Sequence, residues 1–379
     1  MKNKKICHLT SVHHRYDDRI FLKECKTLSD AGFDVNLIVA DGKGDEVVDK
    51  IKIYDVGKPI NRKERILKTT KKVLKKALEI NAEIYHFHDP ELIPIGIKLK
   101  KLGKKVIYDV HEDYYSKILN KDYIPSYIVR KVTAIFFNLF EKLVSKKYFD
   151  YIITADNHTK EKFNAKNAVR IANFIPISEI NLQIESAQNL LTKSEKEEYI
   201  CVYVGGLSKN RGLLKMAEAI ENMPYKIRLH LVGKFENQTD INLIKKYTKT
   251  QYLGFKPWNE TIKIIMNADI GLLLLQPIPS YLYAGENTIK LFEYMFCGIP
   301  IITSNFKNLT NIIEENNCGI CVDPTKPEEI AKAIEYLITH PDKARKMGEN
   351  GRKVVLEKYN WEKESEKLIE IYTTLTGGL

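Results

Sequence analysis

The stretch GFKPWNETIKIIMNADIGLLLLQPIPSYLYAGENTIKLFEYMFCGIPIITS, residues 254–304, decides the fold class of this chain. It holds two short apolar runs rich in isoleucine and leucine, Ile270–Leu275 and Ile299–Thr303. Such runs are typical of strands that are buried on both faces of a parallel sheet. A helical segment precedes the first run, and a glycine-bearing loop and a second helix lie between the two. The stretch therefore predicts strand–helix–strand units of an α/β protein.

The loop 283–287 leads into a helix that we expect to begin near Asn287 or Thr288. A helix N-terminus presents unpaired N–H groups and a partial positive charge, so it suits an anion such as diphosphate. Glu293 follows one to two turns later, where a carboxylate can accept hydrogen bonds from a ribose diol. Lys290 lies three residues before Glu293 and so shares its helix face. Loop and helix together predict half of a nucleotide-sugar site.

Strands and helices alternate through both halves of the chain, which predicts doubly wound parallel sheets. The polar residues 176–198 interrupt this rhythm and are interpreted as a linker. We expect two Rossmann-like domains, 1–175 and 199–360, facing a central cleft, with ligands at the carboxyl ends of their strands. A last helix, 361–379, is expected to pack back towards the first domain.

The charge of the chain is uneven. The net charge is +11 at pH 7, and all of it lies in the first 180 residues, which hold 35 lysines and arginines against 24 acidic residues. This asymmetry indicates an anionic partner, either membrane or nucleic acid, although a solvated lysine-rich surface explains it equally well. Six cysteines scattered through apolar segments fit a reducing cytosol. With no signal-peptide pattern and no bilayer-spanning stretch, a cytoplasmic protein is expected.

The strand expected at 199–204 ends in the sequence GGLSKNRG, residues 205–212. Gly205 and Gly206 allow the backbone to approach a phosphate, and Arg211 can grip that phosphate through two parallel hydrogen bonds. The spacing is not G-x-G-x-x-G, so no dinucleotide site is predicted. A glycine turn between strand and helix is often structural, but Arg211 falls where a doubly wound sheet places its ligand.

Several ordered motifs support a closer assignment. The chain resembles the retaining glycosyltransferases of family four, which have the GT-B fold, and among them the members that build bacterial surface polysaccharides such as O-antigen or capsule. The resemblance covers nearly the whole chain. It rests on SVHHRYDDRIFLKECKTLSDAGFDV (11–35), YHFHDPEL (85–92), IYDVHED (107–113), YVGGLSKNRGL (203–213), NTIKLFEYMFCGIPII (287–302) and YNWEKESEKLIEIY (359–372).

The resemblance implies roles in the second domain. Arg211 corresponds to the basic residue, usually lysine, that neutralises the leaving diphosphate, and Lys290 is a second source of charge where Gly206 replaces a basic residue. Glu293 matches the second of two signature glutamates and implies a ribose contact. The first falls on Gly285, so backbone amides are expected to take over part of the contact to the donor sugar. The donor-binding residues implied are Gly205, Gly206, Gly233, Glu286, Asn287, Thr288 and Ile289.

In the first domain, His111 follows the strand expected at 105–110. It resembles the family's active-site histidine, which faces the donor sugar near the reacting carbon. Its place at a strand end supports this interpretation over simple packing, because ligands of such folds bind there. His88 and Asp89 form a second strand-end pair. For them, a structural role at the start of the next helix explains the residues as well as an acceptor-side role does.

The loop after the first strand is expected to face the acceptor with His13, His14 and Arg15. Neighbouring histidines in an extended loop seldom converge on one ion, and no third ligand is evident, so we predict no metal. No cofactor is expected either, because the nucleotide sugar is a substrate. Cys318 and Cys321 have the spacing of a redox or zinc pair, but they lack a second pair and are interpreted as part of a buried strand.

The helix expected at 126–147 mixes Phe136, Phe137 and Phe140 with several lysines. Aromatic residues with basic flanks suit the surface of an anionic membrane. A core helix with one solvated face explains the aromatic residues slightly better, but the one-sided charge keeps the membrane interpretation open for the domain. We therefore expect peripheral association with the inner face of the cytoplasmic membrane.

The resemblance implies transfer of a hexose or N-acetylhexosamine from a nucleotide diphosphate sugar to a glycan acceptor, lipid-linked in this subgroup, with retained anomeric configuration. It implies a metal-independent, front-face mechanism in which the leaving diphosphate takes the acceptor's proton. Two alternatives stay open: a nucleotide-sugar epimerase of the same fold, and a glycan- or nucleotide-binding module without transfer. Nucleic acid is not expected as a partner, because no stacking platform accompanies the charge.

Overall fold

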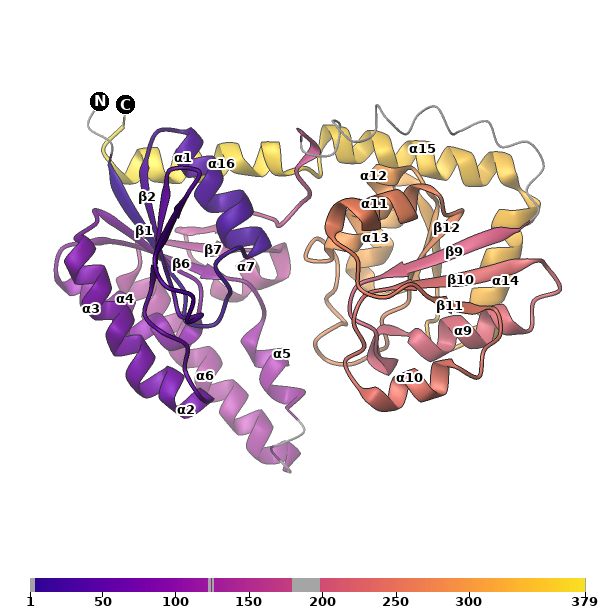
Figure 1. Ribbon diagram of the computed structural model, residues 1–379, viewed down its shortest axis with the longest axis horizontal. Helices are drawn as coiled ribbons and strands as arrows, with labels where there is room; N and C mark the ends of the chain where they lie inside the picture. Colours follow the sequence, from indigo (N-terminus) through magenta and orange to yellow (C-terminus); the bar gives the residue numbers. More distant parts are fainter. Residues whose placement is uncertain (1–3, 122–123, 125, 179–197, 379) are drawn as a thin grey trace. The chain divides into compact units, whose positions relative to one another are not determined.

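The computed structural model describes residues 4–121, 124, 126–178 and 198–378 of the chain. The described residues form two compact units (Figure 1). The first unit runs to Asn173 and resumes at Trp361, whereas the second comprises Phe174–Asn360. Most of the linker expected at 176–198 lies outside the described residues. Each unit is an α/β fold built on a parallel sheet, as the alternation of the sequence predicted.

The described part of the first unit is centred on an eight-stranded sheet with the order β3-β4-β2-β1-β5-β6-β7-β8. Its strands pair in parallel, apart from the antiparallel pair β3 and β4. The central strands are almost wholly buried, which explains their continuous apolar sequences. The strands are β1 Lys5–Leu9, β2 Asp34–Val39, β3 Glu46–Val48, β4 Ile51–Asp55, β5 Ile84–Phe87, β6 Lys105–Val110, β7 Tyr151–Thr154 and β8 Ala168–Arg170.

Helices of the first unit pack on both faces of this sheet, because alternate strand residues point to opposite sides. Cys7 and Leu9 pack against α3 and α4, whereas Ile6 packs with η1 and α16. Segments η1 and η2 are π-helical, and η3 is a 3₁₀ turn. The helices are η1 Asp18–Cys25, α1 Lys26–Asp30, α2 Arg62–Glu64, η2 Arg65–Thr69, α3 Thr70–Ile80, η3 Pro90–Leu92, α4 Ile93–Lys101, α5 Tyr114–Leu119, α6 Tyr127–Tyr148, α7 Asn157–Phe163 and α16 Trp361–Leu375.

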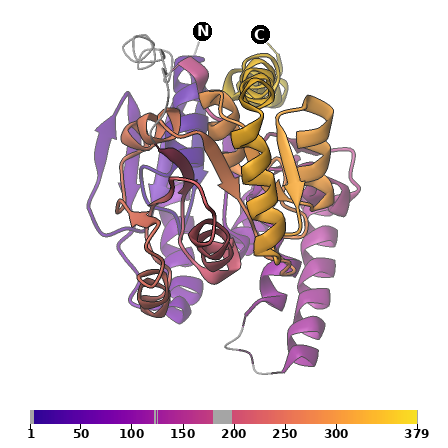
Figure 2. The ribbon, with the colours of Figure 1, turned by 90° about the vertical axis from the view of Figure 1, so that its right-hand side faces the viewer.

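Helix α16 packs on the first unit although it follows the whole second unit in sequence (Figure 2, yellow helix viewed almost along its axis). The indole of Trp361 donates a hydrogen bond to the hydroxyl of Thr27 at 3.0 Å. The buried carboxylate of Glu364 accepts from Arg170 at 2.9 Å and from the N–H of Ala172 at 3.0 Å. These contacts and the apolar face of α16 complete the core of the first unit.

The second unit has a six-stranded parallel sheet in its described residues, with the order β11-β10-β9-β12-β13-β14. The strands are β9 Tyr199–Val204, β10 Ile227–Val232, β11 Thr250–Tyr252, β12 Ile270–Leu273, β13 Ile301–Ser304 and β14 Gly319–Val322. The helices are η5 Lys209–Arg211, α9 Leu213–Glu221, α10 Gln238–Ile244, α11 Trp258–Met266, α12 Ile289–Cys297, α13 Lys307–Asn316, α14 Pro327–Thr339 and α15 Pro341–Glu357.

The strand order of each unit reverses beside one strand. In the first unit β1 lies between β2 and β5, and in the second unit β9 lies between β10 and β12. At such a reversal the connections leave on opposite faces, and a crevice opens outside the carboxyl ends of the strands. The loops after β1, β5 and β6, and those after β9 and β10, are therefore the places where each unit can bind a ligand.

Helix α6 differs from its expected role. The interpretation of this segment as a core helix is wrong, because the side chain of Phe136 is 71% exposed and Phe140 is exposed as well. The residues that α6 buries are Ala134, Glu141 and Ser145. Helix α5, strand β3 and helix α13 were not expected from the sequence. Helix α12 begins at Ile289 with Thr288 as its N-cap, within one residue of the expected start.

Candidate functional site

Glycines form the turn at the end of β9 in the second unit. Gly205 has a φ of +115° and Gly233, at the end of β10, has a φ of +140°. A Cβ atom on Gly233 would lie 1.8 Å from the carbonyl oxygen of Gly205, so the two strand ends approach too closely for any other residue. Gly205 itself is exposed. The backbone at the end of β9 is therefore accessible to a ligand.

Two cations lie against this glycine turn, Gly205–Gly206. The ammonium of Lys290 donates to the hydroxyl of Tyr203 at 3.0 Å, and a Cβ atom on Gly205 would lie 2.6 Å from its Nζ atom. The Nε atom of Arg211 would lie 3.2 Å from a Cβ atom on Gly206. The structure thus brings together residues from β9, η5 and α12 that are far apart in sequence.

The N-terminus of α12 adds to the positive charge near Lys290. The preceding turn is closed by the N–H of Thr288, which donates to the carbonyl of Gly285 at 2.9 Å, and by Asn287, which accepts from the N–H of Gly285 at 3.1 Å. The side chain of the N-cap residue Thr288 forms no capping hydrogen bond. Because Lys290 is the second residue of α12, its ammonium and the helix dipole act in the same region.

In this structure Arg211 has an acidic partner and Glu293 has an aromatic partner. The Nε atom of Arg211 donates to Glu236 at 2.9 Å, and both side chains are partly exposed. The buried carboxylate of Glu293 accepts from the indole of Trp258 at 2.8 Å. Glu293 therefore faces α11, and its expected contact with a ribose remains a prediction.

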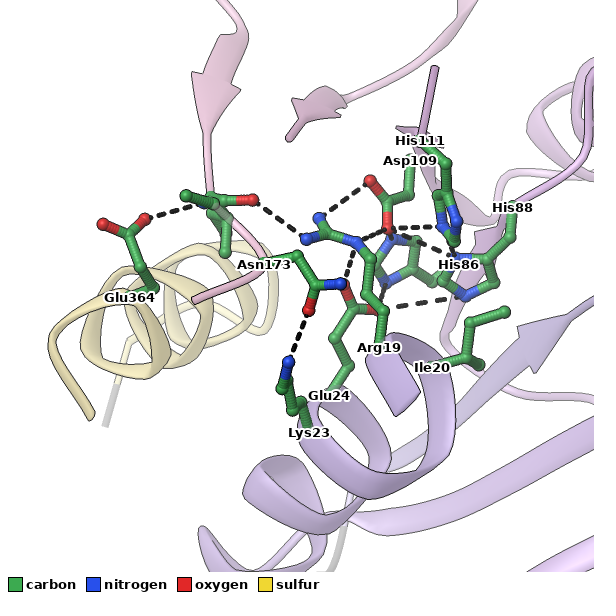
Figure 3. Close-up of polar contacts among 12 residues, drawn as sticks. Arg19, Ile20, Lys23, Glu24, His86, His88, Asp109, His111, Asn173 and Glu364 are labelled. Carbon is green, nitrogen blue, oxygen red and sulfur yellow. Dashed lines mark hydrogen bonds and ion pairs between the residues drawn. The ribbon is translucent and has the colours of Figure 1, made fainter. Parts of the chain in front are cut away.

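In the first unit, four histidines gather at neighbouring strands, and Figure 3 shows three of them, His86, His88 and His111. His8 lies on β1, His86 lies opposite it on β5, and His88 and His111 follow β5 and β6. We call these four residues the histidine cluster. Its contacts include His8 Nδ1 to His88 Nε2 at 3.0 Å, His88 Nδ1 to His111 Nε2 at 3.0 Å, and contacts of Tyr372 Oη with His8 Nε2 at 3.1 Å and with His86 Nδ1 at 2.9 Å.

A buried ion pair lies beside the cluster (Figure 3). Arg19 of η1 binds Asp109 of β6 through Nε at 2.8 Å and Nη2 at 3.0 Å. Burial alone raises the pKa of Asp109, but the charge of Arg19 and then the interaction with His111 outweigh it and hold that pKa well below the usual range. Glu24 lies next to this pair, and burial, followed by the charge of Asp109, raises its pKa well above the usual range.

The loop after β1 reaches this cluster through one of its three expected residues. The ring of His13 lies against that of His111 at an interplanar angle of 50°, with centroids 4.9 Å apart, and its Nε2 atom lies 3.6 Å from Asp89. His14 is exposed on the same loop. Arg15 is buried and binds Asp41 and Glu46 at 2.7–2.8 Å, so it holds the loop in place.

Two groups of described residues have the composition of a metal site. They are His8, Glu24, His86 and His88, and His88, Asp109 and His111. Most imidazole nitrogens of the first group already contact one another, Tyr372 or His111 at 2.9–3.1 Å, whereas His86 Nε2 has no hydrogen-bond partner among the described residues. The guanidinium of Arg19 lies 3.1 Å from Glu24. Apart from His86 Nε2, the nitrogens serve as donors and acceptors of a hydrogen-bonded network rather than as free ligands.

Comparison with known proteins gives a family match in the second unit. Residues 186–354 match the family model described as glycosyl transferases group 1. This match lies within the second unit and does not reach the first. The chain is also 22% identical over 386 residues to the capsular polysaccharide biosynthesis glycosyltransferase CapM of Staphylococcus aureus, an alignment that covers 99% of this chain and 98% of CapM.

Solved structures show the same architecture. Sucrose-phosphate synthase from Thermosynechococcus elongatus superposes with a TM-score of 0.76 at 17% identity, over 98% of this chain and 99% of the other. HepE of Anabaena, in complex with UDP and glucose, superposes with a TM-score of 0.72 at 14% identity, over 98% and 100% of the two chains. At this identity the likeness concerns the fold. The glycosyltransferase therefore has the GT-B fold that its sequence motifs implied.

Sequence reasoning missed several residues of the glycosyltransferase's buried network. His86 and His88 are two residues apart and therefore point to the same side of β5, which is a signal that the sequence does contain. Arg19, Glu24 and Tyr372 come from helices, and no local pattern connects them to the strand ends. The six cysteines are free thiols in the described structure, and burial raises the pKa of Cys318 to about 12, as suits a structural role.

Gly285→Glu is expected to lower the activity at least tenfold, although it introduces the glutamate that the resemblance implies at this position. A Cβ atom at Gly285 would lie 2.8 Å from the Cβ atom of Asn308, so the loop must move before any side chain fits. The measurement is the rate of nucleotide release, with Asn308→Gly/Gly285→Glu as the relieved variant. A single Gly285→Glu variant that is as active as the parent would contradict this steric account.

Proposed function

We propose that the glycosyltransferase transfers a hexose or N-acetylhexosamine from a nucleotide diphosphate sugar to a lipid-linked glycan acceptor in bacterial surface polysaccharide synthesis, with retention of configuration. The observation that carries this proposal is the convergence of Arg211 and Lys290 on the glycine turn, next to the N-terminus of α12. Two cations and a helix N-terminus around exposed backbone suit a diphosphate. The similarity to CapM over the whole chain supports the polysaccharide role.

In this mechanism the charge on the leaving diphosphate is the main demand on the protein. Arg211, Lys290 and the α12 N-terminus would stabilise that charge as the glycosidic bond breaks, and the diphosphate would take the proton of the acceptor hydroxyl. Glu293 would accept hydrogen bonds from the ribose. His111 would orient the donor sugar next to the acceptor-side residues His13 and Asp89.

The first experiment is a screen of the purified protein against UDP-, GDP- and dTDP-sugars, with released nucleotide measured in the presence and absence of a lipid-linked acceptor extract. UDP-sugars come first, because HepE was solved with UDP and glucose. Release that depends on the acceptor supports transfer. Conversion of a donor without acceptor would instead support an epimerase, and binding without turnover would support a binding module.

Removal of metal ions is expected to leave transfer unchanged. The diphosphate charge is balanced by Arg211, Lys290 and the helix N-terminus in this proposal, so no ion is required at the phosphates. The measurement is the transfer rate in about 5 mM EDTA, which is a large excess over any bound ion. This rate is compared with the rate after MgCl₂ is added back. A rate that falls more than fivefold in EDTA and recovers with magnesium would overturn metal independence.

We further propose that α6 binds an anionic membrane and so brings the enzyme to a lipid-linked acceptor. Among the described residues, no helix combines the length and the apolar character that crossing a bilayer requires. The exposed apolar side chains of α6 are Tyr127, Ile128, Val129, Val132, Ile135, Phe136, Leu139, Phe140 and Leu143. Lys131, Lys142, Lys146 and Lys147 lie on the same helix, which stands beside α5 (Figure 2, magenta). Apolar residues with flanking lysines suit a negatively charged lipid surface.

Leu143→Glu is expected to weaken binding to anionic vesicles at least tenfold, because it places a negative charge in the apolar surface of α6. The matched control is Val47→Glu on β3, since the side chains of Val47 and Leu143 are both 68% exposed. Sedimentation with phosphatidylglycerol-containing and neutral vesicles measures the effect. Equal binding to both kinds of vesicle, or an equal loss in the control variant, would rule out this role of α6.

A further inference from the structure

The histidine cluster and Tyr372 form one continuous chain of contacts between His86 and His111. The order is His86, Tyr372, His8, His88 and His111, with successive polar atoms 2.9–3.1 Å apart. All members except His111 are fully buried. An uncharged imidazole has one N–H donor and one bare acceptor nitrogen. The placement of one proton therefore fixes the placement of every other proton along the chain.

Asp109 determines in which direction the hydrogen bonds along this series of contacts are donated. Its Oδ2 atom lies 3.1 Å from His111 Nε2 and 3.3 Å from His88 Nδ1, and those two nitrogens are 3.0 Å apart. Two N–H groups that face each other repel, so one nitrogen carries the proton and the other is bare. The shorter distance to the carboxylate assigns the proton to Nε2 of His111, which donates to both Asp109 and His88.

The far end of the chain agrees with this direction. With Nδ1 bare, His88 carries its proton on Nε2 and donates to His8, which in turn donates to Tyr372, and the Tyr372 hydroxyl donates to His86 Nδ1. His86 then carries its proton on Nε2, which has no hydrogen-bond partner among the described residues and lies 4.0 Å from the Asp109 carboxylate. The opposite direction would turn a bare nitrogen of His86 towards that anion. The same charge therefore favours one proton order at both ends.

Burial keeps the internal histidines uncharged, as this proton order requires. It lowers the pKa of His8 and of His86 well below the ordinary value, and it lowers the pKa of His88 to about 4 despite the hydrogen bond and charge of Asp109. The charged and titratable groups that face the chain from the surrounding elements are Arg19, Glu24, Asp109, His13, Asp89 and Asp17.

We propose that this chain holds the proton of His111 on Nε2, so that Nδ1 is a bare nitrogen that accepts a hydrogen bond from a hydroxyl of the sugar, and that Tyr372 is a positioning residue for this state. The role of the hydroxyl contact rests on the proposed function, whereas the proton placement does not. Tyr372 acts on His111 through His8 and His88. A side chain of the last helix thus sets the hydrogen-bonding character of a residue at the end of β6.

Tyr372→Phe tests the proposal, because it removes the link between His8 and His86 without a change of shape. The N–H on Nε2 of His8 would then lack an acceptor, which is costly for a buried donor. The reverse order avoids this cost, since His8 would donate from Nδ1 to His88, and His88 from Nδ1 to Asp109. His111 would then carry its proton on Nδ1. The matched control is Tyr85→Phe, because Tyr85 is equally buried in this unit and bonds to backbone atoms of Ala77 and Ala82.

The readout is the protonation of each ring nitrogen in ¹⁵N-histidine-labelled protein by NMR at pH 7.5, with His111 assigned by its loss in His111→Gln. We expect a bare Nδ1 of His111 in the parent and in Tyr85→Phe, and a protonated Nδ1 in a third or more of the Tyr372→Phe molecules. We expect kcat of Tyr372→Phe to fall about fivefold with KM changed less than twofold. If His111 of the parent protein carries its proton on Nδ1, the proposal is overturned, even if Tyr372→Phe does not fold. If Tyr372→Phe folds and the tautomer of His111 is unchanged, the proposal is overturned as well. The NMR measurement requires no turnover. It therefore tests the proton placement even if the proposed glycosyl transfer is wrong.

Discussion

Arg211→Ala is expected to lower kcat for sugar transfer about 100- to 1000-fold, the usual effect of removing one group that stabilises developing negative charge. The guanidinium lies against the glycine turn at the end of β9, where the leaving diphosphate is proposed to bind. Lys290→Ala is expected to have a similar effect, because its ammonium lies on the neighbouring side of the same turn. The measurement is steady-state nucleotide release at saturating acceptor.

Two variants control for general loss of charge or structure. Lys343 donates to the hydroxyl of Tyr336 at 2.9 Å and lies 5.2 Å from its ring, which matches the contacts of Lys290 with Tyr203. Lys343→Ala is therefore expected to keep full activity. Arg211→Lys keeps the charge and is expected to retain activity within about tenfold of the parent. If Arg211→Ala were as active as Lys343→Ala, the diphosphate would have to bind elsewhere.

Acidification from pH 7 to pH 5 is expected to destabilise the first unit. A histidine whose pKa is lower in the folded than in the unfolded state stabilises the fold above the unfolded value of 6.5, and this contribution is lost as the pH falls. His88, with a pKa of about 4, loses about 2 kcal/mol over this range at 1.36 kcal/mol per pH unit. His8 and His86 act in the same direction, whereas the raised pKa of Glu24 has the opposite sign.

The two tryptophans allow this effect to be followed in the first unit. Trp361 lies in the core of the first unit, and Trp258 lies on α11 of the second. Urea unfolding of Trp258→Phe, monitored by tryptophan fluorescence, therefore reports on the first unit. In the same background His86→Gln should reduce the difference in stability between pH 7 and pH 5, because the lowered pKa of His86 contributes to it. Stability that is unchanged or higher at pH 5 would show that the cluster is not uncharged when folded.

The architecture could be predicted where burial is uniform along a segment. The run 270–275 contains β12, and the start of α12 fell within one residue, because contiguous apolar residues and a capping position are local signals. Helix α6 could not be predicted in this way. Its inner face carries the buried Glu141, which accepts from Tyr108 at 2.7 Å and from Lys162 at 2.7 Å, while Phe136 faces outwards. Hydrophobicity alone assigns these two residues to the wrong sides.

Strand ends allowed part of each candidate site to be predicted. In the second unit, Gly205 and Arg211 follow an expected strand, and in the first unit His88 and His111 do so. Within each unit, a parallel sheet brings such residues to the same edge. Their partners could not be found, because these come from elements that are remote in sequence. Tyr372 contacts His8 across 364 positions, and a single sequence carries no signal for that distance.

The return of the chain to the first unit has a consequence for synthesis on the ribosome. Residues 4–173 emerge first but lack Trp361, Leu368 and Tyr372, so one face of the nascent sheet stays partly uncovered while the second unit is made. The second unit, contiguous in sequence, can fold as soon as it leaves the exit tunnel. The part translated first is thus completed last. A premature stop that removes only α16 would leave an intact second unit attached to an aggregation-prone, unfinished first unit that chaperones and proteases would recognise.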